Sequence, residues 1–438
     1  MGSGHMKTLG IDIGTTTISA VIRDSGSGVA EAMNIKNDTF LPGEPWERIQ
    51  DPEKIRLKVE HCLQELLSRF PDVQAIGVTG QMHGILYLDA QGRAVSPLYT
   101  WQDGRGDLPF DQRTSWASHL SERTGYPLST GYGLATHFYN ERSHLIPREA
   151  VTFCTISDYI AMGLAGADSP RLDATNAASL GIFDCVRGCF DTAAMEKAGM
   201  NPALLPQLAQ TPLLGVGKLG IPVYTAIGDN QASFLGATGG KRDVLLVNMG
   251  TGGQVSVFSP VYLQAGGLET RPFPGGGWLL VGASLCGGRS YALLERFFRQ
   301  TVQMVTGQDI PAYEAMARML ENTQDLDNLP CCNTTFQGTR ADPACRASIT
   351  GLDENNFTPA HLTWSLMEGM ARELQQMYVS FLEAGGKRSV QMIGSGNGLR
   401  KNPWLQKVFE QVFQCPMTCS VYQEEAALGA ALYAARNV

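Results

Sequence analysis

The hydrophobic positions of this chain follow two alternating patterns. Short apolar runs of strand length occur at residues 9–13, 75–79, 244–247 and 390–393. Between them lie longer segments whose apolar residues recur every three to four positions, the spacing of one buried helix face. Strands that alternate with helices are typical of α/β domains. The pattern therefore predicts an α/β fold.

Two of the predicted helices carry clear start and stop signals. The first begins with Asp51 as N-cap and Pro52 at the first helical position. The second begins at residues 358–359 and ends at the glycine pair 385–386. Their predicted inward faces are Ile55, Val59, Leu63 and Leu66 in the first helix, and Leu362, Leu366, Met370, Leu374 and Met377 in the second.

Two segments predict matching strand–turn–strand hairpins with Gly and Thr at the turn. They cover residues 9–22 and 244–258. β-Branched residues after each turn favour a second strand over a helix, and neither turn has the Gly-Lys-Ser/Thr of a P-loop. A Gly/Thr turn offers backbone N–H groups and hydroxyls to an anion. One such turn alone is more often an ordinary hairpin, but two together suggest a site for nucleotide phosphates, with Asp12 as a carboxylate on the metal side.

A third segment places an acidic residue between an apolar run and a helix start. Asp229 follows the run 221–227 and precedes the small residues 232–237. Asp is a favoured N-cap, so Asp229 could simply cap this helix. A carboxylate on a turn at the end of a strand is equally well placed to meet a ligand. Its position just ahead of the second Gly/Thr hairpin favours the ligand interpretation.

Two polar segments are candidates for sugar binding. His83 stands on a glycine-flanked turn after the run 75–79, where it could meet a ligand or hydrogen-bond within its own loop. Trp101 offers an apolar face suited to the C–H face of a sugar, and Asp103 and Arg105 offer partners for its hydroxyls. The alternative for this second segment is a surface turn with a salt bridge.

Taken together, these segments resemble the FGGY family of carbohydrate kinases, within the sugar kinase–actin–chaperone ATPase superfamily. Asp-Ile-Gly-Thr-Thr at 12–16 is similar to the first phosphate loop of that family, and Asn-Met-Gly-Thr-Gly at 248–252 to the second. Gly-Asp-Asn-Gln-Ala-Ser at 228–233 is similar to the segment with the catalytic Asp. The resemblance covers essentially the whole chain. It implies two actin-like (ribonuclease H-like) ATPase domains, each with a mixed five-stranded sheet flanked by helices, and an active site in the cleft between them.

The resemblance also implies ATP-dependent transfer of the γ-phosphoryl group to a primary sugar hydroxyl. Asp229 would be the catalytic base, and Mg²⁺ would lie near Asp12 and Asp229. The turn at 394–398 would bind adenosine, although the family more often has three consecutive glycines there. The expected sugar contacts are Gln81, Met82, His83, Trp101, Asp103, Arg105, Asp229 and Asn230. The expected ATP contacts are Gly14, Thr15, Thr16, Thr17, Gly250, Thr251, Gly252, Gly394, Ser395, Gly396, Asn397 and Gly398.

Within the family, three segments resemble sedoheptulokinases, which phosphorylate the terminal hydroxyl of a seven-carbon ketose. They are residues 100–105, 228–233 and 283–288. Xylulokinase, which shares the Gln-Met-His-Gly segment, is the alternative, together with other ketose or polyol kinases. A non-catalytic sugar or nucleotide sensor on the same fold is a third interpretation. It is disfavoured because a sensor has no need for Asp229.

The 438 residues are enough for two large domains. Residues 1–6 resemble a cloning remnant, and we expect an N-terminal domain at 7–240 and a C-terminal domain at 241–438. Residues 173–179 are predicted to be a loop that shapes the first domain, and 322–356 to be long surface connections.

Composition excludes several other classes of function. The net charge of −8 and pI near 5.5 argue against a nucleic-acid partner. No apolar stretch is long enough for a membrane span, and we expect no signal peptide. The ten scattered cysteines, including the adjacent pair 331–332, contain no pair of CxxC elements, so we expect reduced thiols in a cytoplasmic protein without zinc. The sequence leaves the oligomeric state open, a homodimer included.

Overall fold

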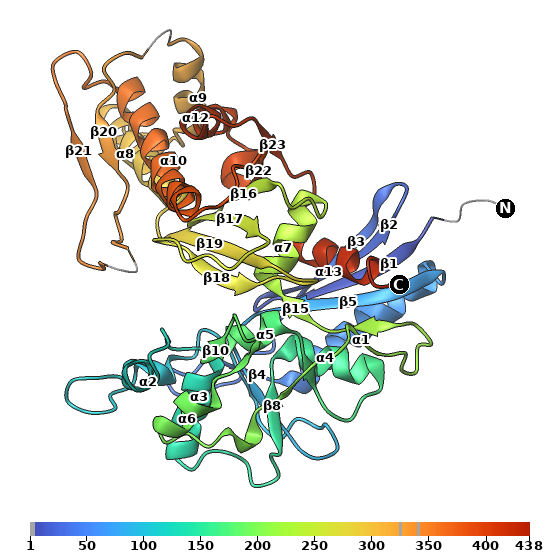
Figure 1. Ribbon diagram of the computed structural model, residues 1–438. Helices are drawn as coiled ribbons and strands as arrows, with labels where there is room; N and C mark the ends of the chain where they lie inside the picture. Colours follow the sequence, from blue (N-terminus) through green and yellow to red (C-terminus); the bar gives the residue numbers. More distant parts are fainter. Residues whose placement is uncertain (1–4, 324–325, 340–341) are drawn as a thin grey trace. The chain divides into compact units, whose positions relative to one another are not determined.

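The computed structural model describes residues 5–323, 326–339 and 342–438, which form two compact units (Figure 1). Unit 1 comprises Met1–Gly240, Arg271–Gly276 and Glu424–Val438. Unit 2 comprises Lys241–Thr270 and Gly277–Gln423. Each unit is built around one mixed β-sheet with helices packed on it.

The sheet of unit 1 has seven strands, in the order β13-β14-β5-β1-β2-β3 with β15 also beside β5. β1, β2 and β3 form an antiparallel meander, whereas β5 runs parallel to β1, and β15 runs parallel to β5. The carboxyl ends of β1, β5 and β15 therefore meet at one edge of the sheet. The strands are β1 (Lys7–Ile13), β2 (Thr17–Asp24), β3 (Gly28–Lys36), β5 (Val73–Gly80), β13 (Leu213–Gly215), β14 (Val223–Tyr224) and β15 (Ile227–Gly228).

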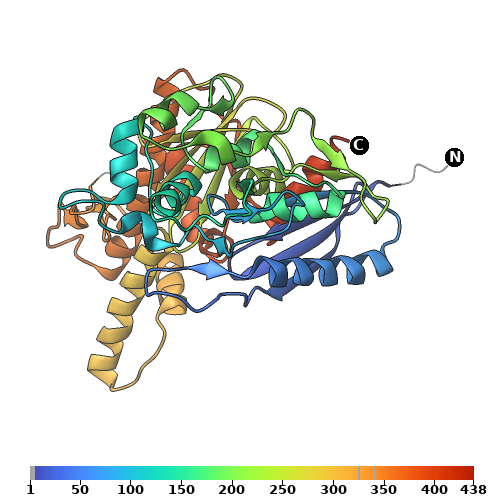
Figure 2. The ribbon, with the colours of Figure 1, turned by 90° about the horizontal axis from the view of Figure 1, so that it is seen from below.

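Helix α1 (Pro52–Arg69) lies along one face of this sheet, as the blue helix in Figure 2 shows. Its buried residues include Ile55, Val59 and Leu63, which join the hydrophobic core with Leu9 and Ile11 of β1. The other helices of unit 1 are η1 (Gly104–Asp107), α2 (Trp116–Thr124), α3 (Gly133–Arg142), α4 (Ile156–Ala165), α5 (Ala174–Ser179), α6 (Thr192–Lys197), η2 (Pro202–Leu204), α7 (Asp229–Thr238) and α13 (Glu425–Ala435). Its smaller strands are β4 (Ile49–Gln50), β6 (Leu86–Leu88), β7 (Leu98–Tyr99), β8 (Thr152–Cys154), β9 (Arg171–Leu172), β10 (Phe183–Asp184), β11 (Cys189–Phe190) and β12 (Gln207–Leu208).

Helix α13 packs against β1 and α7 at a distance that only glycine permits. A Cβ atom added to Gly10 of β1 would lie 1.9 Å from the carbonyl oxygen of Ala427 in α13. A Cβ added to Gly429 of α13 would lie 1.7 Å from the carbonyl oxygen of Ala232 in α7. The core of unit 1 therefore includes a helix that comes very late in the sequence.

The sheet of unit 2 has six strands, in the order β18-β19-β17-β16-β22-β23. β16 and β17 form an antiparallel hairpin, and β22 runs parallel to β16 on its other side. The strands of this sheet and of the hairpin beside it are β16 (Val244–Met249), β17 (Gly253–Ser259), β18 (Glu269–Pro272, whose last two residues belong to unit 1), β19 (Trp278–Ser284), β20 (Cys331–Asn333), β21 (Ser348–Thr350), β22 (Gln391–Ser395) and β23 (Met417–Cys419). Its helices are α8 (Gly288–Thr306), α9 (Tyr313–Glu321), α10 (Pro359–Glu383), α11 (Asn397–Arg400) and α12 (Pro403–Phe413).

The structure confirms the predicted hairpins and capped helices. Asp51 caps α1 and Thr358 caps α10 through their side chains, and both helices have Pro in the first turn. Four predictions are wrong. Each sheet exceeds five strands, because short extra strands extend it. The run 221–227 forms two short strands, the loop expected at 173–179 contains α5, and the region 322–356 contains the hairpin β20–β21 in its described part.

The predicted boundary at residue 240 coincides with the end of the first segment of unit 1. The assignment of residues 241–438 to one domain differs from the structure, because 271–276 and 424–438 belong to unit 1. The physical reason for the second exception is the close packing of α13 on β1 and α7.

Candidate active site

Two carboxylates stand at the edge of the unit 1 sheet where three strands end. Asp12 is the penultimate residue of β1, and Asp229 follows β15 directly as the first residue of α7. Burial, and then the negative charge of Asp229, raise the pKa of Asp12 to about 7. The two carboxylates are therefore close enough to repel each other, and a cation between them would relieve that repulsion.

Asp229 is not the N-cap of its helix. The N-cap of α7 is Gly228, and no side chain caps this end of the helix. One Asp229 oxygen, Oδ1, accepts a hydrogen bond of 2.8 Å from Nδ2 of the neighbouring Asn230. The helix-cap interpretation of Asp229 is therefore wrong.

The turn of the first hairpin is held by side chains from other segments. Asn37 Nδ2 donates to Gly14 O at 2.8 Å, and Gln50 Nε2 donates to Thr15 O at 2.9 Å. The indole Nε1 of Trp101 donates to Thr15 Oγ1 at 2.9 Å. The sequence did not indicate Asn37 or Gln50, because neither stands in a motif. The contacts bring the candidate sugar residue Trp101 against the candidate phosphate turn, on which Thr16 and Thr17 are exposed.

The segment after β5 lies beside the same edge. Gln81 Nε2 donates to Gln50 Oε1 at 2.9 Å, and both side chains are buried. Met82 is buried, and its sulfur lies 3.9 Å from Asn230 Nδ2. The structure therefore brings Gln81 and Met82 together with the two segments that carry Thr15 and Asp229.

His83 has its ring orientation set by two contacts. Its Nδ1 lies 2.6 Å from the carbonyl oxygen of Ser179, and its ring stacks on Tyr132 with centroids 4.4 Å apart. Because a carbonyl can only accept, Nδ1 carries the proton, and Nε2 of the neutral ring is then an acceptor. Neither Tyr132 nor Ser179 was indicated by the sequence, since each is far from His83 along the chain.

Asp103 and Arg105 are interior residues. Their exposed fractions are 0% and 1%, and Arg105 Nε donates to Asp103 Oδ1 at 2.6 Å. Arg105 also donates to Asn140 Oδ1 at 2.5 Å, and Asp103 Oδ2 accepts from the backbone N–H of Arg48 at 3.1 Å. Direct sugar contact by either side chain does not fit these contacts. The pair instead supports the loop on which Trp101, 46% exposed, is carried.

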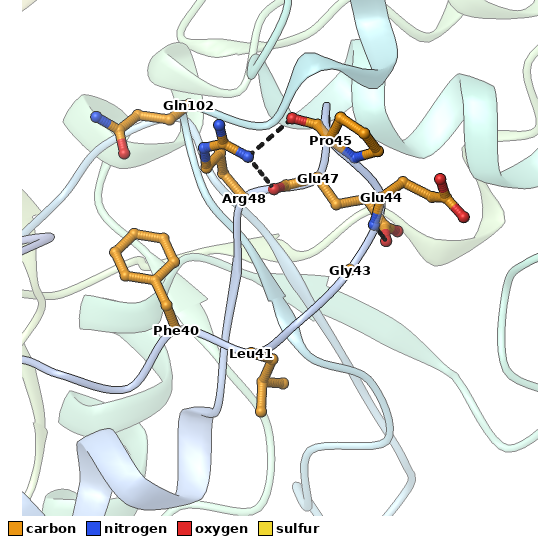
Figure 3. A pocket seen from close by; sticks show the side chains of 8 residues that line it. All are labelled: Phe40, Leu41, Gly43, Glu44, Pro45, Glu47, Arg48 and Gln102. Atoms are coloured by element: carbon orange, nitrogen blue, oxygen red, sulfur yellow. Dashed lines mark hydrogen bonds between the residues drawn. The ribbon is translucent and has the colours of Figure 1, made fainter.

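A pocket of about 510 Å³ opens next to this loop (Figure 3). Gln102, the neighbour of Trp101, contributes to its wall together with Phe40 and Arg48. The Arg48 guanidinium donates through Nη1 to the carbonyl oxygens of Pro45 and Glu47. The pocket thus combines an aromatic ring, an amide and a guanidinium. Its full lining is Phe40, Leu41, Gly43, Glu44, Pro45, Glu47, Arg48 and Gln102.

In unit 2, the second hairpin turn and the glycine-rich turn lie against each other. Asn248 Nδ2, near the end of β16, donates to Ser395 Oγ at 2.9 Å. Gly396 has a positive φ of 80°, and a Cβ there would lie 2.6 Å from Met249 O. Gly250 O and Thr251 O accept from the first N–H groups of α8. Of the predicted ATP contacts in these two turns, Gly250, Thr251 and Asn397 are exposed, Gly252, Gly396 and Gly398 are half-buried, and Gly394 and Ser395 are buried.

The donor set in unit 1 fits Mg²⁺. Two carboxylates and no nitrogen or sulfur ligand suit a hard cation, which commonly uses one or two protein carboxylates beside water and phosphate oxygens. Within the described ranges, no three His, Cys, Asp or Glu side chains gather as an all-protein metal site.

A mixed sheet with a Gly/Thr hairpin turn at its edge is thus repeated in the two units. The models of the FGGY family of carbohydrate kinases match this chain over its length, the N-terminal domain at residues 7–236 and the C-terminal domain at 245–438. The chain therefore belongs to the FGGY family and is a carbohydrate kinase.

Among curated proteins, the chain is 31% identical to sedoheptulokinase from Mus musculus, over 97% of this chain and 96% of the relative. It is 29% identical to sedoheptulokinase from Homo sapiens, over 98% and 97%. Among solved structures, xylulose kinase from Rhodospirillum rubrum has the same fold, with a TM-score of 0.81 at 22% identity over 98% of this chain and 90% of that chain. Among the helices that the structure describes, none is long and apolar enough to cross a membrane.

Proposed function

We propose that this carbohydrate kinase transfers the γ-phosphoryl group of ATP to the terminal primary hydroxyl of a ketose, with sedoheptulose as the preferred acceptor. The observation that carries the reaction is the pair Asp12 and Asp229 at the carboxyl ends of β1 and β15 in the unit 1 sheet, where burial and then the charge of Asp229 raise the pKa of Asp12. The preference for sedoheptulose rests on the near full-length similarity to the two sedoheptulokinases and on the three segments named above.

Asp229 accepts the proton of the attacking hydroxyl. Its carboxylate needs no nucleophilic role, because phosphoryl transfer asks the protein mainly for positioning and for neutralisation of charge. Asp12 and Asp229 would hold Mg²⁺, which supplies charge neutralisation to the phosphates when it is bound. The turn at residues 14–17 in unit 1 is assigned to the phosphates.

The sugar is assigned to the residues around Asp229. His83 is assigned to a sugar hydroxyl, and Asn230 and Trp101 supply an amide and an apolar face. Asp103 and Arg105 are assigned a supporting role behind Trp101, because both are buried. The pocket at Gln102 is the candidate place for sugar atoms beyond Trp101. The adenosine and remaining phosphate contacts are assigned to residues 250–252 and 394–398 in unit 2.

The experiment is a coupled assay of sugar-dependent ADP release with sedoheptulose, xylulose, gluconate and glycerol, run beside the Asp229→Asn variant. We expect the highest kcat/KM with sedoheptulose and near-complete loss of turnover in the variant. Equal kcat/KM for xylulose would reassign the substrate within the family. A turnover rate in Asp229→Asn equal to that of the wild type would overturn the assignment of the base.

A further inference from the structure

We propose that the short helix α5 positions both Asp229 and His83, through Thr175 at one end and Ser179 at the other. The inference rests on the proposed function, because it takes Asp229 as the proton acceptor and His83 as a sugar contact. Thr175 and Ser179 are positioning residues in this proposal, since neither is assigned a contact with substrate.

The Thr175 end of α5 holds the backbone that presents Asp229. Thr175 Oγ1 accepts a hydrogen bond of 2.9 Å from the backbone N–H of Gly228, the residue before Asp229. The same hydroxyl donates to Asp173 Oδ1 at 2.7 Å, which aims its lone pair at Gly228. From β5, Thr79 Oγ1 donates to Ile227 O at 2.7 Å. Two hydroxyls from different elements therefore bind the N–H and the C=O of one peptide group, the Ile227–Gly228 peptide just before Asp229.

Asn176 ties α5 to its surroundings. Its side chain has no exposed surface, and Nδ2 lies 3.1 Å from Asp158 Oδ1 in α4 and 3.3 Å from Ala226 O. Asp158 is itself buried and accepts from Thr155 Oγ1 at 2.6 Å. Because buried polar groups that are bonded in this way resist displacement, α5 has a fixed place relative to α4 and to the strand before Asp229.

The Ser179 end of α5 holds His83. Ser179 Oγ accepts from the backbone N–H of His83 at 3.2 Å and donates to Asn176 O at 2.7 Å. Ser179 O accepts from His83 Nδ1 at 2.6 Å. His83 has a φ of 72°, an uncommon conformation for a residue with a side chain, which has to be held by its surroundings. Ser179 thus supports both the backbone and the ring of His83.

The two ends of α5 therefore predict two different kinetic effects. Displacement of Asp229 changes the geometry of proton transfer and lowers kcat, because reacting groups misplaced by about 1 Å can lose roughly 10²-fold in rate. Displacement of His83 weakens the hold on the sugar and raises its KM. A helix that only stabilised the fold would give neither pattern, and its variants would lose thermal stability with kcat and KM unchanged.

The experiment compares Thr175→Val, Thr175→Ser and Ser179→Ala in the full-length protein. We expect Thr175→Val to lower kcat by roughly 10-fold or more at an unchanged sugar KM, because it removes the partner of a buried N–H. Thr175→Ser keeps the hydroxyl and should restore most of kcat. Ser179→Ala should raise the sugar KM by about 3–10-fold, the range for one lost hydrogen bond, with a smaller effect on kcat.

Thr124→Val in α2 is the matched control. Thr124 Oγ1 donates to Leu120 O at 2.8 Å and accepts from Tyr126 N at 3.3 Å, so, like Thr175, it donates one hydrogen bond and accepts one from a backbone N–H. No residue of α2 is assigned to the site, and we expect the kcat and KM of Thr124→Val to match those of the wild type. Thermal melts of every variant separate loss of folding from loss of geometry, and Thr175→Ala replaces Thr175→Val if the latter does not fold.

The Asp229→Asn variant, assayed in the same series, distinguishes failure of the role of α5 from failure of the proposed function. If Asp229→Asn is inactive while Thr175→Val and Ser179→Ala behave like Thr124→Val, the role of α5 is overturned and the proposed function stands. If Asp229→Asn keeps wild-type turnover, the assignment of Asp229 as the base in the proposed function fails, and the role of α5 fails with it. The split between kcat and KM, with rescue by Thr175→Ser, supports the proposal.

Discussion

The first hairpin of unit 1 and the first hairpin of unit 2 share one backbone plan and carry different chemistry. In each, the first strand pairs antiparallel with the next strand and parallel with a third, as β1 does with β2 and β5, and β16 with β17 and β22. The penultimate residue of the first strand is Asp12 in unit 1 and Asn248 in unit 2. Each is followed by an apolar residue, Gly and Thr. The plan is repeated, but the charge is not.

The difference shows how one strand end serves two purposes. Asp12 is a partly desolvated carboxylate near a second one, an arrangement that costs free energy until a cation joins it. Asn248 is a neutral amide that donates to Ser395 in the glycine-rich turn, so its own hydrogen bond holds that turn in place. Under the proposed function, the strand end of unit 1 would hold the metal and lie beside the proton acceptor, and that of unit 2 would shape the nucleotide site.

The largest effect that would test this comparison concerns Asp229, which has no acidic counterpart assigned in unit 2. Asp229→Asn preserves shape but removes the proton acceptor, so kcat should fall by roughly 10²–10⁴-fold, the range for a positioned general base. The measurement is sugar-dependent ADP release beside a thermal melt. Asp309→Asn, at an exposed ion pair in unit 2, is the control and should keep full turnover.

A second effect concerns Asp12 and Asn248, the residues that differ between the two hairpins. Asp12→Asn makes the unit 1 strand end resemble that of unit 2, and it should raise the Mg²⁺ concentration needed for half-maximal rate by roughly 10-fold or more, because one of two carboxylates is lost. Sugar binding, measured by titration without ATP, should remain nearly unchanged. Unchanged turnover at limiting Mg²⁺ would show that Asp12 only stabilises its hairpin.

A third effect separates the segments that follow the parallel strands, the sugar segment after β5 and the glycine-rich turn after β22. His83→Ala should raise the sugar KM by roughly 10-fold and leave the ATP KM alone, since it removes one oriented acceptor. Gly396→Ala should raise the ATP KM and leave the sugar KM alone, because Gly396 has a φ of 80° and no room for a Cβ beside Met249 O. Steady-state kinetics with each substrate varied in turn measures both. A change of the same KM in both variants would contradict the division of labour.

The smallest effect is a pH dependence of stability. The pKa of Asp12 is raised from 3.8 to about 7 in the folded protein, so the folded state binds a proton that the unfolded state has released across that interval. The contribution of Asp12 to the free energy of unfolding should therefore decline as pH rises from about 4 to about 7 and stay flat above it. Asp12→Asn should remove this decline, whereas Asn248→Ser should not. Denaturant unfolding of both variants and the wild type, at several pH values across that range, measures the slopes.

Local patterns made much of this site predictable. The two hairpins, the capped helices α1 and α10, and Asp229 at a strand end all follow from residues adjacent in sequence, and the structure shows the elements in those places. Contacts between distant residues were not predictable in the same way. Nothing near Asp103 or Arg105 in sequence shows that Asn140 and Tyr139 lie against the Arg105 guanidinium. The link between Ser179 and His83 is hidden for the same reason.

The close packing of α13 on β1 and α7, which Gly10 and Gly429 allow, has a consequence for the order in which the protein can fold during synthesis. β1 and α7 emerge from the ribosome long before residues 425–435, which must pack against both. At about 5–20 residues per second, the chain between Thr238 and Glu425 takes about 10–40 s to be made. During that time the surfaces at Gly10 and Ala232 are not yet covered by α13, while the residues of unit 2 are being synthesised. The last residue of unit 2, Gln423, is therefore made before the last element of unit 1.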